Sequence, residues 1–118
     1  MIDLGSGGGV PGLVVLEARP DLELVLLDAM EKRTALLLDA VAALGATDRC
    51  RVLTGRAEEL GRSEELRGKA SAVIARSFGA PAVTAECGSP FLDDGALLVV
   101  SEPPEAPDRW PAEGLAQL

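Results

Sequence analysis

Short apolar segments alternate along the chain with longer segments of mixed polarity. Strands are predicted at residues 1–4, 23–28, 51–54, 71–75 and 96–101, the last of them after a turn at residues 93–95. Helices are predicted at residues 11–18, 31–44, 57–60 and 81–87. Because strands and helices alternate, the sequence predicts an α/β fold with a mainly parallel five-stranded sheet and helices on both of its faces.

The helix predicted at residues 31–44 has the clearest apolar stripe. Leu37, Val41 and Leu44 recur at steps of four and three residues, which places them on one helix face. Leu36 and Leu38 flank Leu37 and are expected to broaden that stripe. We therefore expect these side chains to pack against the sheet.

The chain is divided by composition into a core and a tail. Its 118 residues suffice for one small domain, and the alternating pattern that predicts the core covers residues 1–101. Prolines crowd residues 102–118, a composition that suits neither a central strand nor a long helix. The short first strand and this proline-rich tail together suggest a core piece of a longer architecture.

The overall composition is that of a water-soluble globular protein. Hydrophobic residues make up 47% and charged residues 25%, and no apolar stretch approaches the roughly 18 residues that cross a bilayer. No basic segment leads into an apolar one at the N-terminus, so no signal peptide is predicted. We expect a cytoplasmic protein with no membrane partner.

Several kinds of chemistry are excluded by the residue types present. The chain has no histidine, and its cysteines, Cys50 and Cys87, lie far apart, so no zinc site of the usual spacing is expected. The lack of histidine also removes every Ser-His and Cys-His catalytic pair. Any reaction must rest on carboxylates, Lys, Arg, Ser or Thr, or on a reactive cofactor.

The net charge bears on possible partners. A formal charge of −8 repels phosphate backbones at long range, because nucleic-acid affinity rests largely on Lys and Arg. Taken alone, the charge predicts a poor nucleic-acid binder.

A glycine-rich turn follows the first strand. Gly5, Gly7 and Gly9 permit positive φ and let the backbone approach a ligand closely, and the helix N-terminus behind them offers N–H groups to a carboxylate or phosphate. Asp28, at the end of the second strand, is placed to accept hydrogen bonds from both hydroxyls of an adenosine ribose. The predicted ligand is a ribonucleoside derivative that lies across the ends of these two strands.

Two templates fit this turn. Residues 7–12 satisfy the dinucleotide pattern G-x-G-x-x-G, and residues 3–9 satisfy the D-x-G-x-G-x-G pattern of S-adenosylmethionine enzymes. Asp3 favours the second template, since its carboxylate suits the methionine ammonium and would repel a pyrophosphate. A structural turn that binds no ligand is the third interpretation.

Several segments together resemble one known family. They are residues 3–12, Arg19-Pro20-Asp21, Leu26-Leu27-Asp28 with Lys32-Arg33, Gly55-Arg56-Ala57-Glu58-Glu59 and Ala75-Arg76-Ser77. Over roughly residues 1–101 the chain resembles the ribosomal RNA small subunit methyltransferase G (GidB) family. The resemblance implies a Rossmann-like class I methyltransferase core that uses S-adenosyl-L-methionine.

Particular cofactor contacts are implied by the resemblance. On matching positions, Gly5 and Val10 would contact the cofactor, Asp28 its ribose, and Ala57 and Glu58 its adenine, mainly through the backbone. The methyl group would go to guanine N7 of 16S ribosomal RNA, so small-subunit ribosomal RNA or the ribosomal subunit is the expected partner.

The catalytic and RNA-binding candidates are basic residues. The resemblance places Arg76 near the methionine end of the cofactor or the incoming RNA, which makes it the candidate catalytic residue. Lys32 and Arg33, after the second strand, are candidates for contact with RNA phosphate. Guanine N7 already presents an unprotonated lone pair, so the expected chemistry is positioning and needs no histidine base.

The chain also departs from the family's pattern. The family's N-terminal helical region and the strands that follow strand five are missing, and Ser101-Glu102 stands where the family tends to have Lys-Gly. The alternatives are therefore a methyltransferase for a small molecule, which suits the acidic surface, a nicotinamide or flavin dinucleotide domain, and a cofactor-binding remnant without RNA activity.

Overall fold

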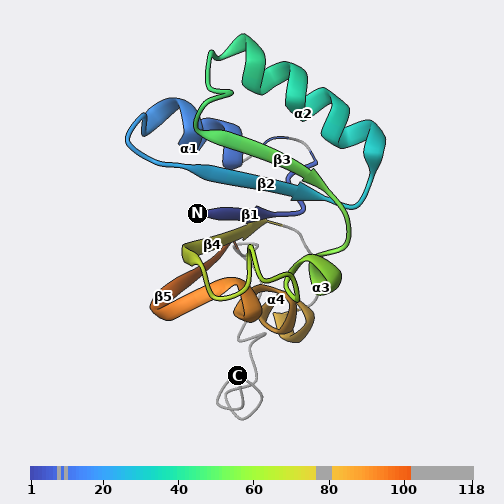
Figure 1. Cartoon of the computed structure of the whole chain (residues 1–118), viewed down its shortest axis with the longest axis vertical. Helices are drawn as coiled ribbons and strands as arrows, with labels where there is room; N and C mark the ends of the chain where they lie inside the picture. The colour runs from blue at the N-terminus through green and yellow to red at the C-terminus, as the bar shows by residue number, and fades with distance from the viewer. Residues whose placement is uncertain (8, 10, 77–80, 102–118) are drawn as a thin grey trace.

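A five-stranded sheet runs through the middle of the molecule, and all four strand pairs are parallel (Figure 1). The computed structural model describes residues 1–7, 9, 11–76 and 81–101. The strands are β1 (Ile2–Leu4), β2 (Leu24–Asp28), β3 (Cys50–Thr54), β4 (Ala70–Arg76) and β5 (Leu92–Ser101), in the spatial order β3-β2-β1-β4-β5. The predicted parallel α/β sheet is confirmed.

Helices connect the strands, as the pattern predicts. They are α1 (Gly12–Ala18), α2 (Glu31–Ala43), α3 (Ala57–Leu60) and α4 (Pro81–Gly88), and a 3₁₀ turn at Ser89–Phe91 leads into β5. In Figure 1, α1 and α2 lie beside β2 and β3, whereas α3 and α4 lie on the side of β4 and β5. The predicted tail, residues 102–118, lies outside the described residues.

Two apolar clusters, one on each face of the sheet, follow from the alternation of side chains along the strands. On β2, Leu24 and Leu26 join the cluster that contains Leu37 of α2. The intervening Leu27 joins the other cluster, which contains Phe91 from the turn before β5. The uninterrupted apolar run of β2 is thus explained by burial on both faces.

The order of the strands determines where a ligand can bind. From β1 the chain moves outward through β2 to β3, and it then crosses to the other side of β1 to form β4 and β5. In open parallel sheets, ligands bind beyond the carboxyl ends of the strands at the point where the order reverses. Here that point is the end of β1, where the glycine turn begins.

The apolar stripe of α2 is narrower than predicted. Leu37 and Val41 are buried, but Leu36 and Leu38 are 63% and 54% exposed, and Leu44 caps the helix end with 40% exposure. Residues on either side of Leu37 are rotated by about 100° on a helix, so they leave the sheet-facing stripe. The position one turn before Leu37 is filled instead by a buried polar residue, Thr34, whose hydroxyl lies 2.7 Å from that of Thr54 on β3.

The turn predicted at residues 93–95 is also different in the structure. Strand β5 begins at Leu92 and continues through these residues, so that Ala70 pairs with Leu92 but Ala72 pairs with Leu97. The extra residues on β5 form an irregularity at which Gly95 has φ +77°. Turn-forming residues here bulge out of a strand, because β4 continues to pair with the segments on both sides of them.

No helix in the described part of the chain has the length and apolar character that a membrane crossing requires.

Candidate cofactor site

The glycine turn is folded back on itself by backbone hydrogen bonds. Ser6 N–H donates to the Leu27 carbonyl at 2.8 Å, and Gly9 N–H donates to the Ser6 carbonyl at 2.5 Å. Gly5 and Gly9 have φ values of +67° and +79°, which other residues rarely adopt. Ser6 is therefore tied to the neighbouring strand β2, and Gly9 is tied to Ser6.

Asp3 lies on β1, just before the turn, and its side chain faces α1. Its side chain is 1% exposed, and its Oδ2 accepts the N–H of Gly12, the first residue of α1, at 3.0 Å. Burial raises the pKa of Asp3 to about 6, although the hydrogen bonds from Ser6 and Gly12 act in the opposite direction. Asp3 thus places a carboxylate at the start of the helix, where a dinucleotide fold would hold its pyrophosphate.

The expectation that the first N–H groups of this helix are free for a ligand is wrong at two positions. Gly12 N–H donates to Asp3, and Leu13 N–H donates to the Gly9 carbonyl at 2.7 Å. The start of α1 therefore stabilises the turn, and a phosphate at the same place would meet the Asp3 carboxylate.

Substitution of Gly12 tests the close packing between α1 and β1. An alanine Cβ there would lie 2.4 Å from Asp3 Oδ2 and 2.7 Å from Leu26 Cδ2, and both side chains are buried. We expect Gly12→Ala to lower the free energy of unfolding by about 1–3 kcal/mol despite the better helix propensity of alanine. Urea denaturation measures the change, with Val14→Ala on the exposed side of α1 as the control. Equal stability of the two variants would contradict this packing.

Asp28 closes β2 with a carboxylate that already binds the backbone. Its Oδ2 accepts the N–H of Gly7 and its Oδ1 accepts the N–H of Met30, both at 2.9 Å. Arg33 Nη1 lies 3.8 Å from Oδ2. A carboxylate can accept about four hydrogen bonds, so Asp28 keeps capacity for two adjacent hydroxyl groups. An alanine Cβ at position 7 would lie 3.0 Å from Oδ2, which explains a glycine at that point of the turn.

A cavity of about 210 Å³ opens at the carboxyl ends of β1, β2 and β3. Its lining residues are Gly5, Leu27, Asp28, Ala29, Gly55, Arg56, Ala57 and Glu58. Four of the predicted cofactor-binding residues, Gly5, Asp28, Ala57 and Glu58, thus come together from three separate segments. Buried Leu27 and Ala57 give the cavity an apolar part, and Asp28 gives it a carboxylate.

Arg56 lines this cavity although the sequence did not identify it as a site residue. Its Nε donates to Glu58 Oε1 at 2.5 Å, and both side chains are exposed. The hydrogen bond from Arg56 lowers the pKa of Glu58. One sequence signal could have identified Arg56: it lies inside the segment Gly55-Arg56-Ala57-Glu58-Glu59, which carries the family resemblance. From that segment we expected only contacts between the backbone of Ala57 and Glu58 and the adenine of the cofactor.

The remaining predicted residues lie around the cavity or outside the description. Gly7 and Gly9 belong to the turn but do not line the cavity, and Val10 lies outside the described residues. Arg76 is exposed at the end of β4, beyond the cavity lining.

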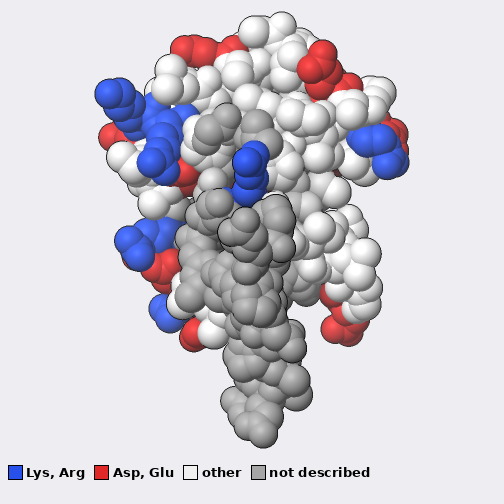
Figure 2. All heavy atoms as spheres, turned by 180° about the vertical axis from the view of Figure 1, so that it is seen from behind, with Lys and Arg blue, Asp and Glu red and all other residues white. Residues whose placement is uncertain are grey.

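Basic side chains gather near this edge of the sheet. Lys32 and Arg33 are exposed at the start of α2, and Arg76 ends the strand next to β1. Figure 2 shows several Lys and Arg side chains along its left side, which corresponds to the right of Figure 1, where β1, β2 and β3 end. Acidic side chains are interspersed among them. The negative net charge of the chain is therefore locally offset beside the cavity.

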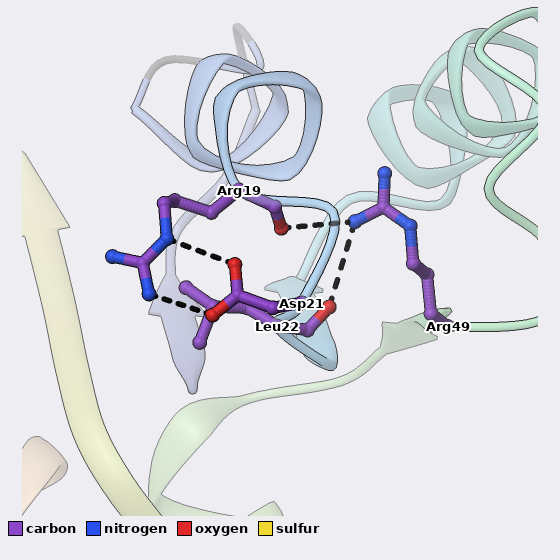
Figure 3. Close-up of polar contacts among 4 residues, drawn as sticks. All are labelled: Arg19, Asp21, Leu22 and Arg49. Atoms are coloured by element: carbon purple, nitrogen blue, oxygen red, sulfur yellow. Dashed lines mark hydrogen bonds and ion pairs between the residues drawn. The ribbon is translucent and has the colours of Figure 1, made fainter.

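The segment Arg19-Pro20-Asp21 lies at the other end of α1 and has a structural role. Arg19 Nε and Nη2 donate to the Asp21 carboxylate at 2.9 and 2.7 Å, and Arg49 Nη1 reaches the carbonyls of Arg19 and Leu22 (Figure 3). Arg49 Nη2 also donates to the Leu16 carbonyl at 2.7 Å. A cation at the C-terminal end of a helix satisfies carbonyls that have no helical partner. This segment connects α1 to β2 and does not contact the cavity.

A second cavity, of about 310 Å³, opens at the amino ends of the strands and contains none of the predicted site residues. The described part of the chain also holds no group of three or more His, Cys, Asp or Glu side chains arranged to bind a metal. Cys50 and Cys87 are free thiols, and burial raises the pKa of each. The larger cavity is therefore not the candidate site.

Comparison with known proteins agrees with the geometry. The family model for rRNA small subunit methyltransferase G, GidB, matches residues 1–103. The ribosomal RNA small subunit methyltransferase G of Moorella thermoacetica is 36% identical over 104 residues, which are 88% of this chain and 43% of that protein. The protein of the same name from Parasynechococcus marenigrum is 42% identical over 99 residues, which are 82% of this chain and 40% of the relative.

A solved structure extends the comparison to the fold. The S-adenosylmethionine-dependent methyltransferase of Geobacter sulfurreducens, in complex with S-adenosyl-L-homocysteine, superposes with a TM-score of 0.68 at 25% identity and covers 91% of this chain and 43% of that one. This chain spans less than half the length of all three proteins. The chain belongs to the rRNA small subunit methyltransferase G (GidB) family, and its sheet and helices form the Rossmann-like α/β core of class I methyltransferases.

Proposed function

We propose that this chain is the cofactor-binding core of an S-adenosylmethionine-dependent methyltransferase that modifies guanine N7 in small-subunit ribosomal RNA. The observation that carries the proposal is the cavity in which Gly5, Asp28 and the segment Ala57-Glu58 meet at the carboxyl ends of three strands. The names of the relatives supply the ribosomal RNA acceptor.

The residues present fit an adenosyl ligand. Asp28 has hydrogen-bonding capacity for two ribose hydroxyls, and the adjoining cavity has the apolar surfaces of Leu27 and Ala57 for a base. Asp3, behind the glycine turn, favours a ligand without a pyrophosphate at the start of α1. A nicotinamide or flavin dinucleotide fits this carboxylate poorly.

In the methyl transfer, the main task of this chain is to position the reacting atoms rather than to move a proton. S-adenosylmethionine supplies a methyl group on a positively charged sulfur, and the N7 lone pair forms the new C–N bond as the C–S bond breaks, which leaves neutral S-adenosylhomocysteine. No residue needs to remove a proton from N7, which is consistent with a chain that lacks histidine. Holding the reacting atoms in line can by itself lower a barrier by several kcal/mol.

Basic residues at the same edge would receive the RNA. Lys32 and Arg33 at the start of α2, and Arg76 at the end of β4, provide positive charge for phosphate groups. We assign Arg76 to the methionine end of the cofactor or the entering guanine, because β4 ends beside β1. Because the proposed substrate is the small ribosomal subunit, we infer that the protein acts in the cytoplasm.

Methylation of small ribosomal subunits tests the proposal. The protein is incubated with radiolabelled S-adenosylmethionine and with subunits that lack N7-methylguanine. We expect label in the RNA at a guanine N7. Binding of S-adenosylhomocysteine without label in RNA would refute the RNA acceptor and favour a small-molecule acceptor or a remnant. Saturable binding of NAD alone would refute the cofactor.

A further inference from the structure

The carboxylate of Asp3 is almost completely buried, in apolar surroundings. Its partners in register on the flanking strands are Leu26 of β2 and Ile74 of β4, and all three side chains are buried. The neighbours of Asp3 along β1, Ile2 and Leu4, belong to the cluster on the opposite face. An ionised group in such surroundings is disfavoured unless another charge compensates it.

No such charge is paired with Asp3 in the described part of the chain. The charged residues on the elements around it are Glu17 on α1, Asp28 at the end of β2, Arg76 at the end of β4, and Glu31, Lys32, Arg33 and Asp39 on α2. None of them forms an ion pair with Asp3, and Arg33 pairs with Asp28 instead. Among the described residues the compensation comes from neutral groups: Gly12 N–H donates to Asp3 Oδ2, and the Ser6 hydroxyl, which donates to the backbone carbonyl of Asp3 at 2.9 Å, lowers the pKa of Asp3 from nearby.

The hydrogen bond that Asp3 makes to α1 does not by itself require a negative charge. A neutral side-chain carbonyl, such as that of asparagine, can accept the Gly12 N–H equally well in geometric terms. The pKa of Asp3, raised to about 6, still leaves the group ionised at neutral pH. The described part of the fold therefore retains a buried negative charge that has no ion-pair partner there.

We propose, on the basis of the function proposed above, that Asp3 is a selectivity residue that favours the positively charged methyl donor over its neutral product. With 1% exposure it does not touch the cofactor and acts through the electric field behind the glycine turn. S-adenosylmethionine carries a sulfonium charge that S-adenosylhomocysteine lacks, so only the donor gains from a nearby anion. Inside a protein such an interaction is screened far less than in water.

A matched pair of ligands isolates this effect. The affinities of S-adenosylmethionine and S-adenosylhomocysteine are measured by calorimetry at pH 7.5 for the wild-type protein, Asp3→Asn and Asp48→Asn. Asp48 is exposed and lines the cavity at the opposite, amino edge of the sheet, so its substitution removes the same charge far from the site. The two ligands share every group except the methyl and its charge.

We expect Asp3→Asn to lower the ratio of donor to product affinity by about 3- to 10-fold, and Asp48→Asn to leave it unchanged. In the wild type, the ratio should also fall as the pH decreases from 7 to 5, because Asp3 takes up a proton near pH 6, whereas Asp3→Asn should show no such fall.

If Asp3 had only a structural role, Asp3→Asn would lower the affinities for both ligands by the same factor. An unchanged ratio in Asp3→Asn, with both ligands still bound, would therefore overturn the inference while leaving the proposed function intact. Failure of the wild type to bind either ligand would overturn both.

Discussion

Asp28→Ala is expected to weaken S-adenosylhomocysteine binding by about 1.5–3 kcal/mol for each ribose hydroxyl that the carboxylate accepts. Hydrogen bonds to a charged acceptor are stronger than neutral ones, and Asp28 is only 5% exposed, so water replaces them poorly. Titration calorimetry at pH 7.5 measures the loss. With two hydroxyls bound, the affinity falls by at least two orders of magnitude.

The controls separate the ligand contact from the structural role of the same carboxylate. Asp28 also accepts the N–H groups of Gly7 and Met30, so alanine loosens the turn as well as removing the contact. Asp28→Asn keeps an acceptor of the same shape and should bind more tightly than Asp28→Ala but less tightly than wild type. Asp39→Asn, on the exposed side of α2, should bind like wild type. Full affinity in Asp28→Ala would refute the ribose contact.

Arg33 lies beside Asp28 and is also one of the residues proposed above to contact RNA phosphate. Its Nη1 lies 3.8 Å from Asp28, but its side chain is 54% exposed, and pairs of this kind contribute only about 0–1 kcal/mol. Such a weak pair leaves Arg33 free to make the phosphate contact proposed above. Lys32, the next residue, is exposed and can serve the same purpose.

The architecture was predictable because its signals are local. Apolar strands such as residues 24–27 are continuous when both faces are covered, and the glycine turn and Asp28 mark the two strand ends that face a ligand. These features depend on residue type and spacing, which the sequence displays directly. The order of the strands in the sheet was not predicted from the sequence, because it depends on which strands pair.

The predictions that were wrong concern segments whose conformation or burial is determined by tertiary contacts. Leu36 and Leu38 are apolar, but only residues at three- and four-residue steps from Leu37 reach the sheet, and Thr34 occupies one of those positions. Pairing with β4 kept residues 93–95 within β5 although their composition favours a turn.

The orientation of Asp3 was also beyond the sequence. The expectation was a carboxylate beside the glycine turn that suits the methionine ammonium, and the structure adds that alternation along β1 directs this side chain to the face of the sheet that α1 covers. Since Asp3 is held by Gly12 and almost fully buried, any influence on the cofactor has to be electrostatic. The residue type indicated the correct charge, whereas the contact required the structure.

Asp3→Asn is expected to stabilise the protein at neutral pH by up to roughly 3 kcal/mol, because the folded state raises the pKa of Asp3 from its usual 3.8 to about 6. The sign follows from proton binding. Between pH 3.8 and about pH 6, Asp3 is protonated in the folded protein but ionised in the unfolded chain. The wild type therefore loses stability as the pH rises through this range. Above about pH 6, this loss of stability is complete and no longer changes with pH.

Urea denaturation of both proteins at several pH values between 4 and 8 measures this difference. The free energies of unfolding of wild type and Asp3→Asn should be similar near pH 4, diverge between pH 4 and 6, and stay apart above pH 6, with the variant the more stable. Asp48→Asn, which changes an exposed carboxylate, should follow the wild type throughout. A variant that is less stable than wild type at pH 7.5 would mean that the charge of Asp3 contributes to folding, and its retention would then need no ligand to explain it.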